Sequence, residues 1–284
     1  MSLIAITGAT GQLGRLIVEK LKAKVPAANI VALVRTPAKA ADLGVAVREA
    51  DYNRPETLEA ALKGVETVML VSGNELGKRA AQHRAVIEAA KKAGVRRIVY
   101  TSLLHADTTP IRILADEHLA TENDLKASGI AYTILRNGWY TENYTASVPG
   151  AVKGGAFLGA AGEAKISSAT RADYAEAAAT VLAGTGYEGK VFELAGDTAY
   201  TLADLAAEIS RQTGKAIPYR NLTEAEYAAV LKGFGFAAPM AGAYASFDTG
   251  AAQGGLFEDG GDLARLIGRP TTPLAVAVAA ALKA

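Results

Sequence analysis

The sequence of 284 residues contains no cysteine, which excludes disulfide bonds, thiolate nucleophiles and cysteine-ligated zinc. It has one tryptophan and three histidines, and no two histidines have the spacing of a metal-binding motif, so we expect no metal site. Neither sign of charge dominates, because 30 basic and 29 acidic side chains give a net charge of +1. We therefore expect neither a nucleic acid nor an anionic membrane surface as a partner.

Long apolar runs are also missing, and none approaches the ~20 residues needed to cross a bilayer. A strand pattern begins at Leu3, so we expect no signal peptide before it and a cytoplasmic protein, which suits a chain without cysteine. Half of the residues are apolar, enough for a large core in one domain or in a domain with a smaller companion. The oligomeric state stays open, with a homodimer as one candidate.

The most informative stretch is a glycine-rich turn between a predicted strand and a predicted helix. Residues 3–7 form a short apolar run, and residues 13–24 follow a helical period. Glycines there let the backbone bend and let a phosphate approach the helix N-terminus, whose N–H groups and partial positive charge favour an anion. The sequence therefore predicts a dinucleotide held by Gly8, Thr10, Gly11, Gln12, Leu13 and Gly14.

Strand-like and helix-like segments alternate as far as residue 140. Apolar runs predict strands over 30–34, 45–50, 67–71, 97–101 and 131–135, with helices over 55–62, 78–93 and 112–128. This alternation is typical of an α/β fold with a doubly wound parallel sheet of the Rossmann type. Ligands bind outside the carboxyl ends of such strands, where the sequence places Arg35, Asp51, Ser72, Ser102 and Asn137.

Beyond residue 140 the alternation loosens. We expect a hairpin over 156–168, a helix from about 171 to 184, a seventh sheet strand over 191–194, and helices over 201–213, 223–232, 262–267 and 273–282. Residues 1–140 and 172–195 are thus assigned to the dinucleotide-binding domain, and residues 141–171 and 196–284 to a smaller α/β lobe that binds the substrate. Residues 233–261, rich in glycine, alanine and aromatic side chains, fit either a small second core or a flap over a flat substrate.

The residue after the second predicted strand indicates which dinucleotide binds. An NAD site usually has an acidic residue about 20 positions beyond the glycines, yet Lys20 to Ala41 contains none. Arg35 stands there instead, and a guanidinium can grip a 2′-phosphate with two hydrogen bonds, so we expect NADPH. Asp51 either accepts from the adenine amino group or caps the next turn, and Ser72 and Gly73 offer backbone groups to the cofactor ribose.

Several segments, taken in order, give the chain a family resemblance. They are residues 7–14, Val34-Arg35, Thr101-Ser102, Leu135-Arg136-Asn137-Gly138-Trp139-Tyr140 and Thr170-Arg171-Ala172-Asp173-Tyr174. Over nearly its full length the sequence resembles the NmrA-like branch of the atypical short-chain dehydrogenases. Within that branch, residues 100–107 and 136–144 are most similar to the bacterial NADPH:quinone oxidoreductases, with triphenylmethane dye reductases as near neighbours.

The sequence departs from the wider superfamily at its catalytic pair. Ordinary short-chain dehydrogenases use Tyr-x-x-x-Lys, whose tyrosine protonates the nascent alkoxide, but no tyrosine here has a lysine four residues later. The resemblance puts His118 at the lysine position and Leu114 at the tyrosine position. A quinone does without that acid, because the hydroquinone anion is delocalised and positioning can supply most of the catalysis. The resemblance therefore implies hydride transfer from NADPH to a quinone or a similar flat acceptor.

The resemblance also implies roles for single residues. It puts Asn137 beside the nicotinamide, and Trp139, Tyr140 and Asn143 on the substrate side. Several alternatives stay open. Trp139 either stacks on a flat ring or packs between the lobes. His118 is either a proton donor or a hydrogen-bonded helix residue. Ser102 is either the active-site hydroxyl or a strand-end cap, and Arg171 contacts either the pyrophosphate or the lobe junction.

A second function, from another class, is a redox sensor that binds NADP(H) and reports its oxidation state to a regulatory partner. The missing Tyr-x-x-x-Lys pair fits such a protein equally well. The aromatic residues Trp139 and Tyr140 favour the enzyme.

Overall fold

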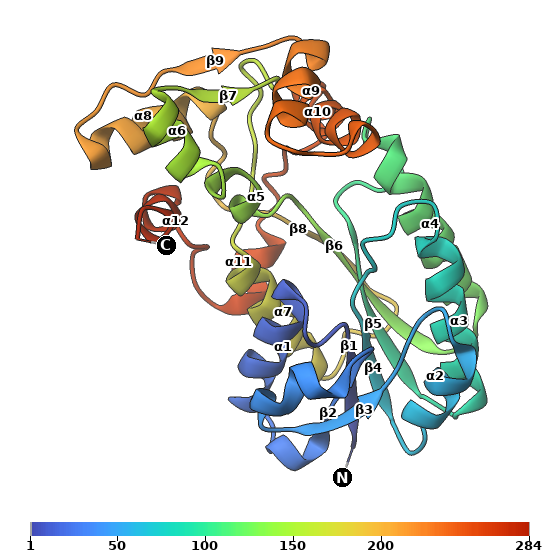
Figure 1. The fold of residues 1–284 in the computed structure, drawn as a ribbon. Helices are drawn as coiled ribbons and strands as arrows, with labels where there is room; N and C mark the ends of the chain where they lie inside the picture. Colours follow the sequence, from blue (N-terminus) through green and yellow to red (C-terminus); the bar gives the residue numbers. More distant parts are fainter. Residues whose placement is uncertain (1, 284) are drawn as a thin grey trace.

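A seven-stranded, wholly parallel sheet forms the centre of the protein (Figure 1). The computed structural model describes residues 2–283. The strand order is β3-β2-β1-β4-β5-β6-β8. The strands span Ile4–Thr7 (β1), Ile30–Val34 (β2), Ala46–Glu49 (β3), Thr67–Leu70 (β4), Arg97–Leu103 (β5), Ala131–Asn137 (β6) and Val191–Leu194 (β8). The strand order reverses at β1 and β4, the kind of switch point where doubly wound sheets bind dinucleotides, so the predicted Rossmann fold is confirmed.

Helices cover both faces of this sheet (Figure 1). One face carries α1 (Gln12–Lys22), α7 (Arg171–Ala183) and the short α11 (Asp262–Ile267). The other carries α2 (Pro55–Ala61), α3 (Arg79–Lys92) and α4 (Arg112–Ala127), and the 3-10 turns η1 (Ala27–Asn29) and η2 (Pro37–Leu43) flank β2. Ile4 and Ile6 face the first set of helices, whereas Ala5 between them faces the second. Burial on both sides explains why the strands are apolar runs without alternation.

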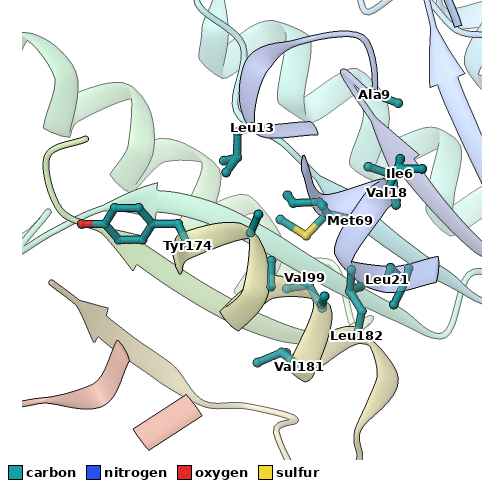
Figure 2. Packing of buried hydrophobic residues seen from close by; sticks show 14 of the residues in the cluster. Ile6, Ala9, Leu13, Val18, Leu21, Met69, Val99, Tyr174, Val181 and Leu182 are labelled. Carbon is teal, nitrogen blue, oxygen red and sulfur yellow. The ribbon is translucent and has the colours of Figure 1, made fainter. Parts of the chain in front are cut away.

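The apolar cluster between the sheet and helices α1 and α7 joins distant parts of the chain. Figure 2 shows strand residues Ile6, Met69 and Val99 packed with side chains of both helices, among them Val18, Leu21, Val181 and Leu182. Burying a side chain of this size contributes about 1.5–3 kcal/mol. Helix α7 is therefore an integral part of the sheet layer, although it follows β6 only after a long excursion of the chain.

The smaller lobe combines this excursion with the chain that follows β8. Its helices are α5 (Thr141–Thr145), α6 (Val148–Gly154), α8 (Leu202–Thr213), α9 (Glu224–Gly233), α10 (Ala238–Ala252) and α12 (Leu274–Ala281). A two-stranded parallel sheet of β7 (Phe157–Gly159) and β9 (Tyr219–Asn221) completes it. The lobe has its own apolar core, which includes Phe157, Leu205 and Phe247. The predicted strand 191–194 and the predicted helices at 171, 201, 223, 262 and 273 are confirmed within one or two residues.

The predicted hairpin over residues 156–168 is wrong. β7 pairs in parallel with β9, with Phe157 opposite Tyr219, and residues 160–168 contribute only a single bridge at Ile166. Gly159 is required by close packing and not by a tight turn. A Cβ there would lie 2.8 Å from Leu202 Cδ1 and 3.0 Å from Asp248 Oδ2, so the strand end needs a small residue next to the lobe core.

Residues 233–261 contain the one long helix that the sequence did not predict. Phe247 in α10 joins the lobe core, as the second-core alternative expects. Phe234 and Phe236, which precede α10, and Tyr244 within it are exposed. Edge-to-face contacts link Phe236 to Tyr244, Tyr244 to Phe247, and Phe247 to Trp139. The expected division into two domains stays a prediction. The helix α11 lies in the segment assigned to the smaller lobe, yet it packs with α7 and β8 and puts Leu263 into the apolar cluster between the sheet and helices α1 and α7. Within residues 2–283, every helix is too short or too polar to traverse a bilayer.

Candidate active site

The turn between β1 and α1 has the backbone that a bound phosphate requires. Gly8 has a φ of +59°, and its carbonyl accepts the Gly11 N–H at 2.8 Å. A Cβ on Gly14 would lie 2.2 Å from the Gly8 oxygen, so only glycine lets α1 pack against the turn. The first turn of α1 has no acidic side chain. Its N-cap residue is Gly11, so no N-cap side chain accepts a hydrogen bond from the helix N–H groups. Its N–H groups therefore remain available to an anion.

The other predicted residues of this turn surround it. Leu13 is buried in the apolar cluster between the sheet and helices α1 and α7, Thr10 is half-buried, and Gln12 is exposed beside the helix N-terminus. The sequence from Gly8 to Gly14 thus fits a dinucleotide pyrophosphate on backbone grounds.

Arg35 follows β2 at the same edge of the sheet, with 68% of its side chain exposed. Its Nη1 lies 3.7 Å from Glu75 Oε1, an exposed pair worth about 0–1 kcal/mol, which a phosphate can readily replace. Asp51 has different contacts. Its Oδ1 accepts the Asn53 N–H at 2.9 Å, and Oδ2 lies 3.7 Å from Arg54 Nε. These are the contacts of a turn cap.

The loop after β4 is held from inside the protein. The Ser72 N–H donates to Thr101 Oγ1, and the Gly73 N–H donates to His83 Nε2, each at 2.9 Å. Both backbone donors that the sequence offered to a cofactor are thus already bonded.

Two neutral histidines lie beneath this loop. Because His83 Nε2 accepts from Gly73, its proton sits on Nδ1, which faces Thr121 Oγ1 at 2.9 Å. Burial, and then the charge of Arg79, lower the pKa of His83 to about 3. Burial, and then the charges of Arg79 and His83, hold the pKa of His118 well below its usual value. Neither imidazole carries a charge near neutral pH.

His118 has a tyrosine partner, but not from the position that the superfamily uses. The Tyr100 hydroxyl, from β5, lies 2.7 Å from His118 Nδ1. Burial raises the pKa of Tyr100, so the hydroxyl keeps its proton and shares a hydrogen bond with the neutral imidazole. Sequence reasoning passed over Tyr100, His83 and Arg79. A signal existed, since residues 79 and 83 share a helix face and residues 118 and 121 share the face of the neighbouring helix.

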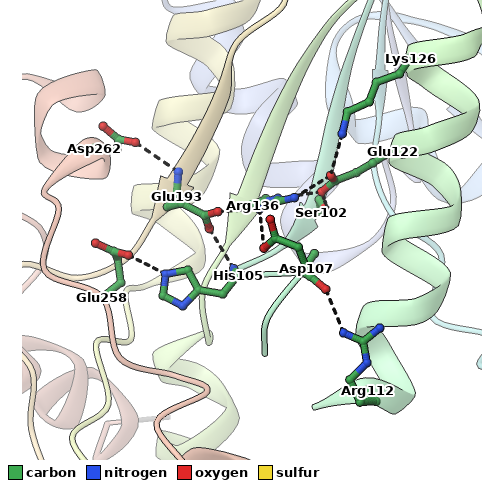
Figure 3. Close-up of polar contacts among 11 residues, drawn as sticks. Ser102, His105, Asp107, Arg112, Glu122, Lys126, Arg136, Glu193, Glu258 and Asp262 are labelled. Atoms are coloured by element: carbon green, nitrogen blue, oxygen red, sulfur yellow. Dashed lines mark hydrogen bonds and ion pairs between the residues drawn. The ribbon is translucent and has the colours of Figure 1, made fainter. Parts of the chain in front are cut away.

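Ser102 belongs to a buried ionic network on the α4 side of the sheet (Figure 3). Its hydroxyl donates to Glu122 Oε1 at 2.6 Å, and Arg136 donates to both oxygens of the fully buried Glu122 at 2.9 Å. Arg136 also contacts Asp107 and Glu193. The Ser102 hydroxyl is therefore bound to the protein's own carboxylate.

The end of β6 brings the remaining predicted residues together. The Arg171 guanidinium lies 4.4 Å from the centre of the Tyr140 ring and donates to Asn143 Oδ1 at 2.8 Å. Asn137 Nδ2 lies 3.5 Å from the Tyr140 hydroxyl. Asn137 Oδ1 and Trp139 Nε1 are buried without a hydrogen bond among residues 2–283, an arrangement that costs about 1–3 kcal/mol for each group and favours a polar ligand.

Among the described residues, no group of three or more acidic or histidine side chains is arranged to hold a metal ion. The sheet order, the glycine turn and the open helix N-terminus together define a Rossmann-type dinucleotide-binding protein. The chain belongs to the NAD(P)H-binding family, whose sequence profile matches residues 8–185.

Relatives match far beyond that segment. Quinone oxidoreductase 2 of Escherichia coli K12 is 58% identical over 279 residues, 97% of each chain. The crystal structure of the E. coli NADPH-dependent quinone oxidoreductase complexed with NADPH matches at 57% identity and a TM-score of 0.96, over 99% of this chain and all of that one. Citrobacter sp. triphenylmethane reductase, complexed with NADP(H), is 38% identical, with a TM-score of 0.95, over 98% of this chain and 99% of that one. The resemblance inferred from the sequence is confirmed.

Proposed function

We propose that this protein is an NADPH-dependent oxidoreductase that transfers hydride to a quinone or a similar flat, electrophilic acceptor. The observation that carries the proposal is the match over nearly the whole of both chains to a quinone oxidoreductase whose structure contains NADPH. The likeness to a dye reductase supports an acceptor that is aromatic and electron-poor rather than one particular quinone.

NADPH supplies the hydride, and the residues of the chain bind and orient the cofactor and the acceptor. The N–H groups at the start of α1 that have no partner take the pyrophosphate, and Arg35 takes the 2′-phosphate. Arg171 either adds a second positive charge near the pyrophosphate or serves mainly to position Tyr140. Asn137 faces the nicotinamide, and Trp139, Tyr140 and Asn143 line the acceptor side. We assign turn-capping to Asp51 and a structural role to Ser102, because their polar atoms are bonded within the protein.

His118 works as a neutral partner of Tyr100 rather than as an acid. Its burial and its lowered pKa leave it uncharged at the pH of the cell. Hydride transfer to a quinone needs no strong acid at the oxygen, since the product anion is delocalised, so this site suits that acceptor better than a simple ketone.

The test is a steady-state assay of the nicotinamide absorbance with NADPH and a panel of quinones, followed by Arg35→Asp. We expect quinone-dependent oxidation of NADPH, and in R35D a rise of about tenfold or more in the NADPH KM with little change for NADH. Arg96→Asp, at the opposite edge of the sheet and 80% exposed, is the matched control. Equal effects of R35D on both cofactors would contradict the role of Arg35.

The same assay separates the second candidate. Tight binding of NADPH without oxidation by any acceptor would identify an NADP(H)-binding redox sensor instead. Cytoplasmic location and a homodimer also remain proposals. Cell fractionation and analytical ultracentrifugation measure them.

A further inference from the structure

Arg79, the first residue of α3, is a buried cation whose hydrogen bonds are incomplete. Its side chain is 8% exposed, and its Nε donates to the Gly73 carbonyl at 2.7 Å. Its backbone N–H donates to Glu117 Oε1 at 3.0 Å. Nη1 lies 3.6 Å from Glu117 Oε2, too far for a hydrogen bond, and neither atom has another partner among residues 2–283. Burying such groups without a hydrogen bond costs free energy, which favours a further polar partner.

The unbonded atoms share one region of the fold. Four buried side-chain atoms lack a hydrogen bond within residues 2–283: Arg79 Nη1, Glu117 Oε2, Asn137 Oδ1 and Trp139 Nε1. Arg79 is tied to the loop after β4 and to α4, and the other two residues follow or end β6. The carboxyl ends of β4, β5 and β6 are neighbours in the parallel sheet. The unsatisfied atoms thus gather where the acceptor and the nicotinamide belong.

The groups around Arg79 leave its charge in place. Tyr100 on β5 and Tyr140 after β6 interact with it and keep their protons, because burial raises the pKa of both. His83 on α3 and His118 on α4 are neutral. Glu117 forms an ion pair with Nη1 at 3.6 Å, which is longer than a hydrogen bond. Because a guanidinium does not lose its proton in proteins, Arg79 stays charged in a poorly hydrated setting, with Glu117 as its counter-ion.

We propose that Arg79 Nη1 binds the acceptor oxygen that becomes negative on reduction, the electrostatic role left open by the missing Tyr-x-x-x-Lys pair. This inference rests on the proposed function and names a catalytic residue for it. The acceptor gains hydride, one proton with two electrons, as the C4–H bond of the dihydronicotinamide breaks and a bond from that hydrogen to the quinone forms. The products are NADP⁺ and a hydroquinone monoanion, which takes its last proton from water. A fixed cation in a site of low dielectric stabilises such an anion strongly.

A phenol that reports its own ionisation tests this charge without turnover. The protein is loaded with NADP⁺, and the absorbance of bound 4-nitrophenol is followed against pH. We expect the bound phenol to have a pKa about one unit lower in the wild type than in Arg79→Met, a tenfold preference for the phenolate. Arg84→Met, on the same helix but exposed and paired with Asp124, should match the wild type. Equal pKa values in the wild type and R79M, or no binding of the phenol to the wild type, would overturn the proposal.

Glu117→Gln covers the case in which R79M does not fold. The amide oxygen of glutamine can still accept the Arg79 N–H, but the negative charge facing Nη1 is gone. We expect the pKa of the bound phenol to fall further than in the wild type, and an unchanged or higher value would refute the role of Arg79. The titration also separates the two proposals. A wild type that favours the phenolate but oxidises NADPH with no quinone would defeat the proposed function and leave the anion site standing.

Discussion

Gly14 lies where the first helix meets the first turn, and the missing Cβ is what allows the contact. With alanine, the Cβ would fall 2.2 Å from the Gly8 oxygen, so either the turn or α1 must move. We expect Gly14→Ala to lower the free energy of unfolding by about 1–3 kcal/mol and to weaken NADPH binding at least tenfold. Urea unfolding and calorimetry measure these. Gly242→Ala in α10, where a Cβ meets nothing within 4 Å, should leave both unchanged or raise the stability slightly.

His83 makes the free energy of unfolding depend on pH. Its pKa is about 3 in the folded protein and about 6.5 in the unfolded chain, so the unfolded chain binds more protons between these values. The contribution of His83 to the free energy of unfolding is therefore fully present above about pH 6.5, and it declines by up to ~1.4 kcal/mol per pH unit as the pH falls. His83→Gln keeps an acceptor for the Gly73 N–H and removes this slope. Urea unfolding from pH 5 to pH 8 tests it, and parallel curves for the two proteins would contradict it.

Single residues also show how far sequence reasoning reaches. The glycine turn and the place of Arg35 could be inferred because the motif is local and its spacing fixes the geometry. The partners of Ser102 could not, since Glu122 and Arg136 reach it from another helix and another strand. For the same reason the sequence could not show that the tyrosine next to His118 is Tyr100, which comes from β5 and not from the helix of His118.

At the scale of elements, the sheet could be predicted because strands buried on both faces are plain apolar runs. The β7–β9 pair could not, because each strand has three residues and the partners are some sixty positions apart. α10 was missed because glycine and proline, the weakest helix formers, interrupt its alanine-rich sequence. Its proline stands in the first turn, where a helix tolerates it, and packing rather than propensity holds the rest.

Asp248 anchors α10 to the loop after β7 and titrates there. Its Oδ2 accepts the Ala160 N–H at 2.8 Å, its Oδ1 accepts from the Tyr144 hydroxyl at 3.2 Å, and burial raises its pKa to about 6. Between about pH 4 and pH 6 the folded protein binds more protons than the unfolded chain, so this residue's contribution to stability falls as pH rises, by up to ~3 kcal/mol. Asp248→Asn should therefore gain stability relative to the wild type between pH 4.5 and pH 7.5. A constant difference in thermal unfolding would contradict this.

At the scale of the whole molecule, Asp173 fastens the end of the chain to the sheet layer. This buried residue of α7 accepts from the N–H and hydroxyl of Thr272 at 3.0 and 3.1 Å, and it pairs with Arg269 at 2.8 Å. Removing it in Asp173→Ala leaves the Thr272 N–H without its partner, and we expect a loss of about 2–4 kcal/mol in the free energy of unfolding. Glu176→Gln, which touches the same arginine from a more exposed position, should cost less than about 1 kcal/mol. Equal losses in guanidinium unfolding would show that Arg269 alone matters.

Because α7 and β8 come late in the sequence, they affect how the chain folds during its synthesis on the ribosome. When the ribosome has released only the first half of the chain, β6 still lacks its outer neighbour, and the side of α1 that later meets α7 is bare. The nucleotide-binding half cannot finish folding until nearly two hundred residues have emerged, and α11 must follow before the layer closes. A gene cut after residue 140 would therefore yield an aggregating fragment rather than a working module.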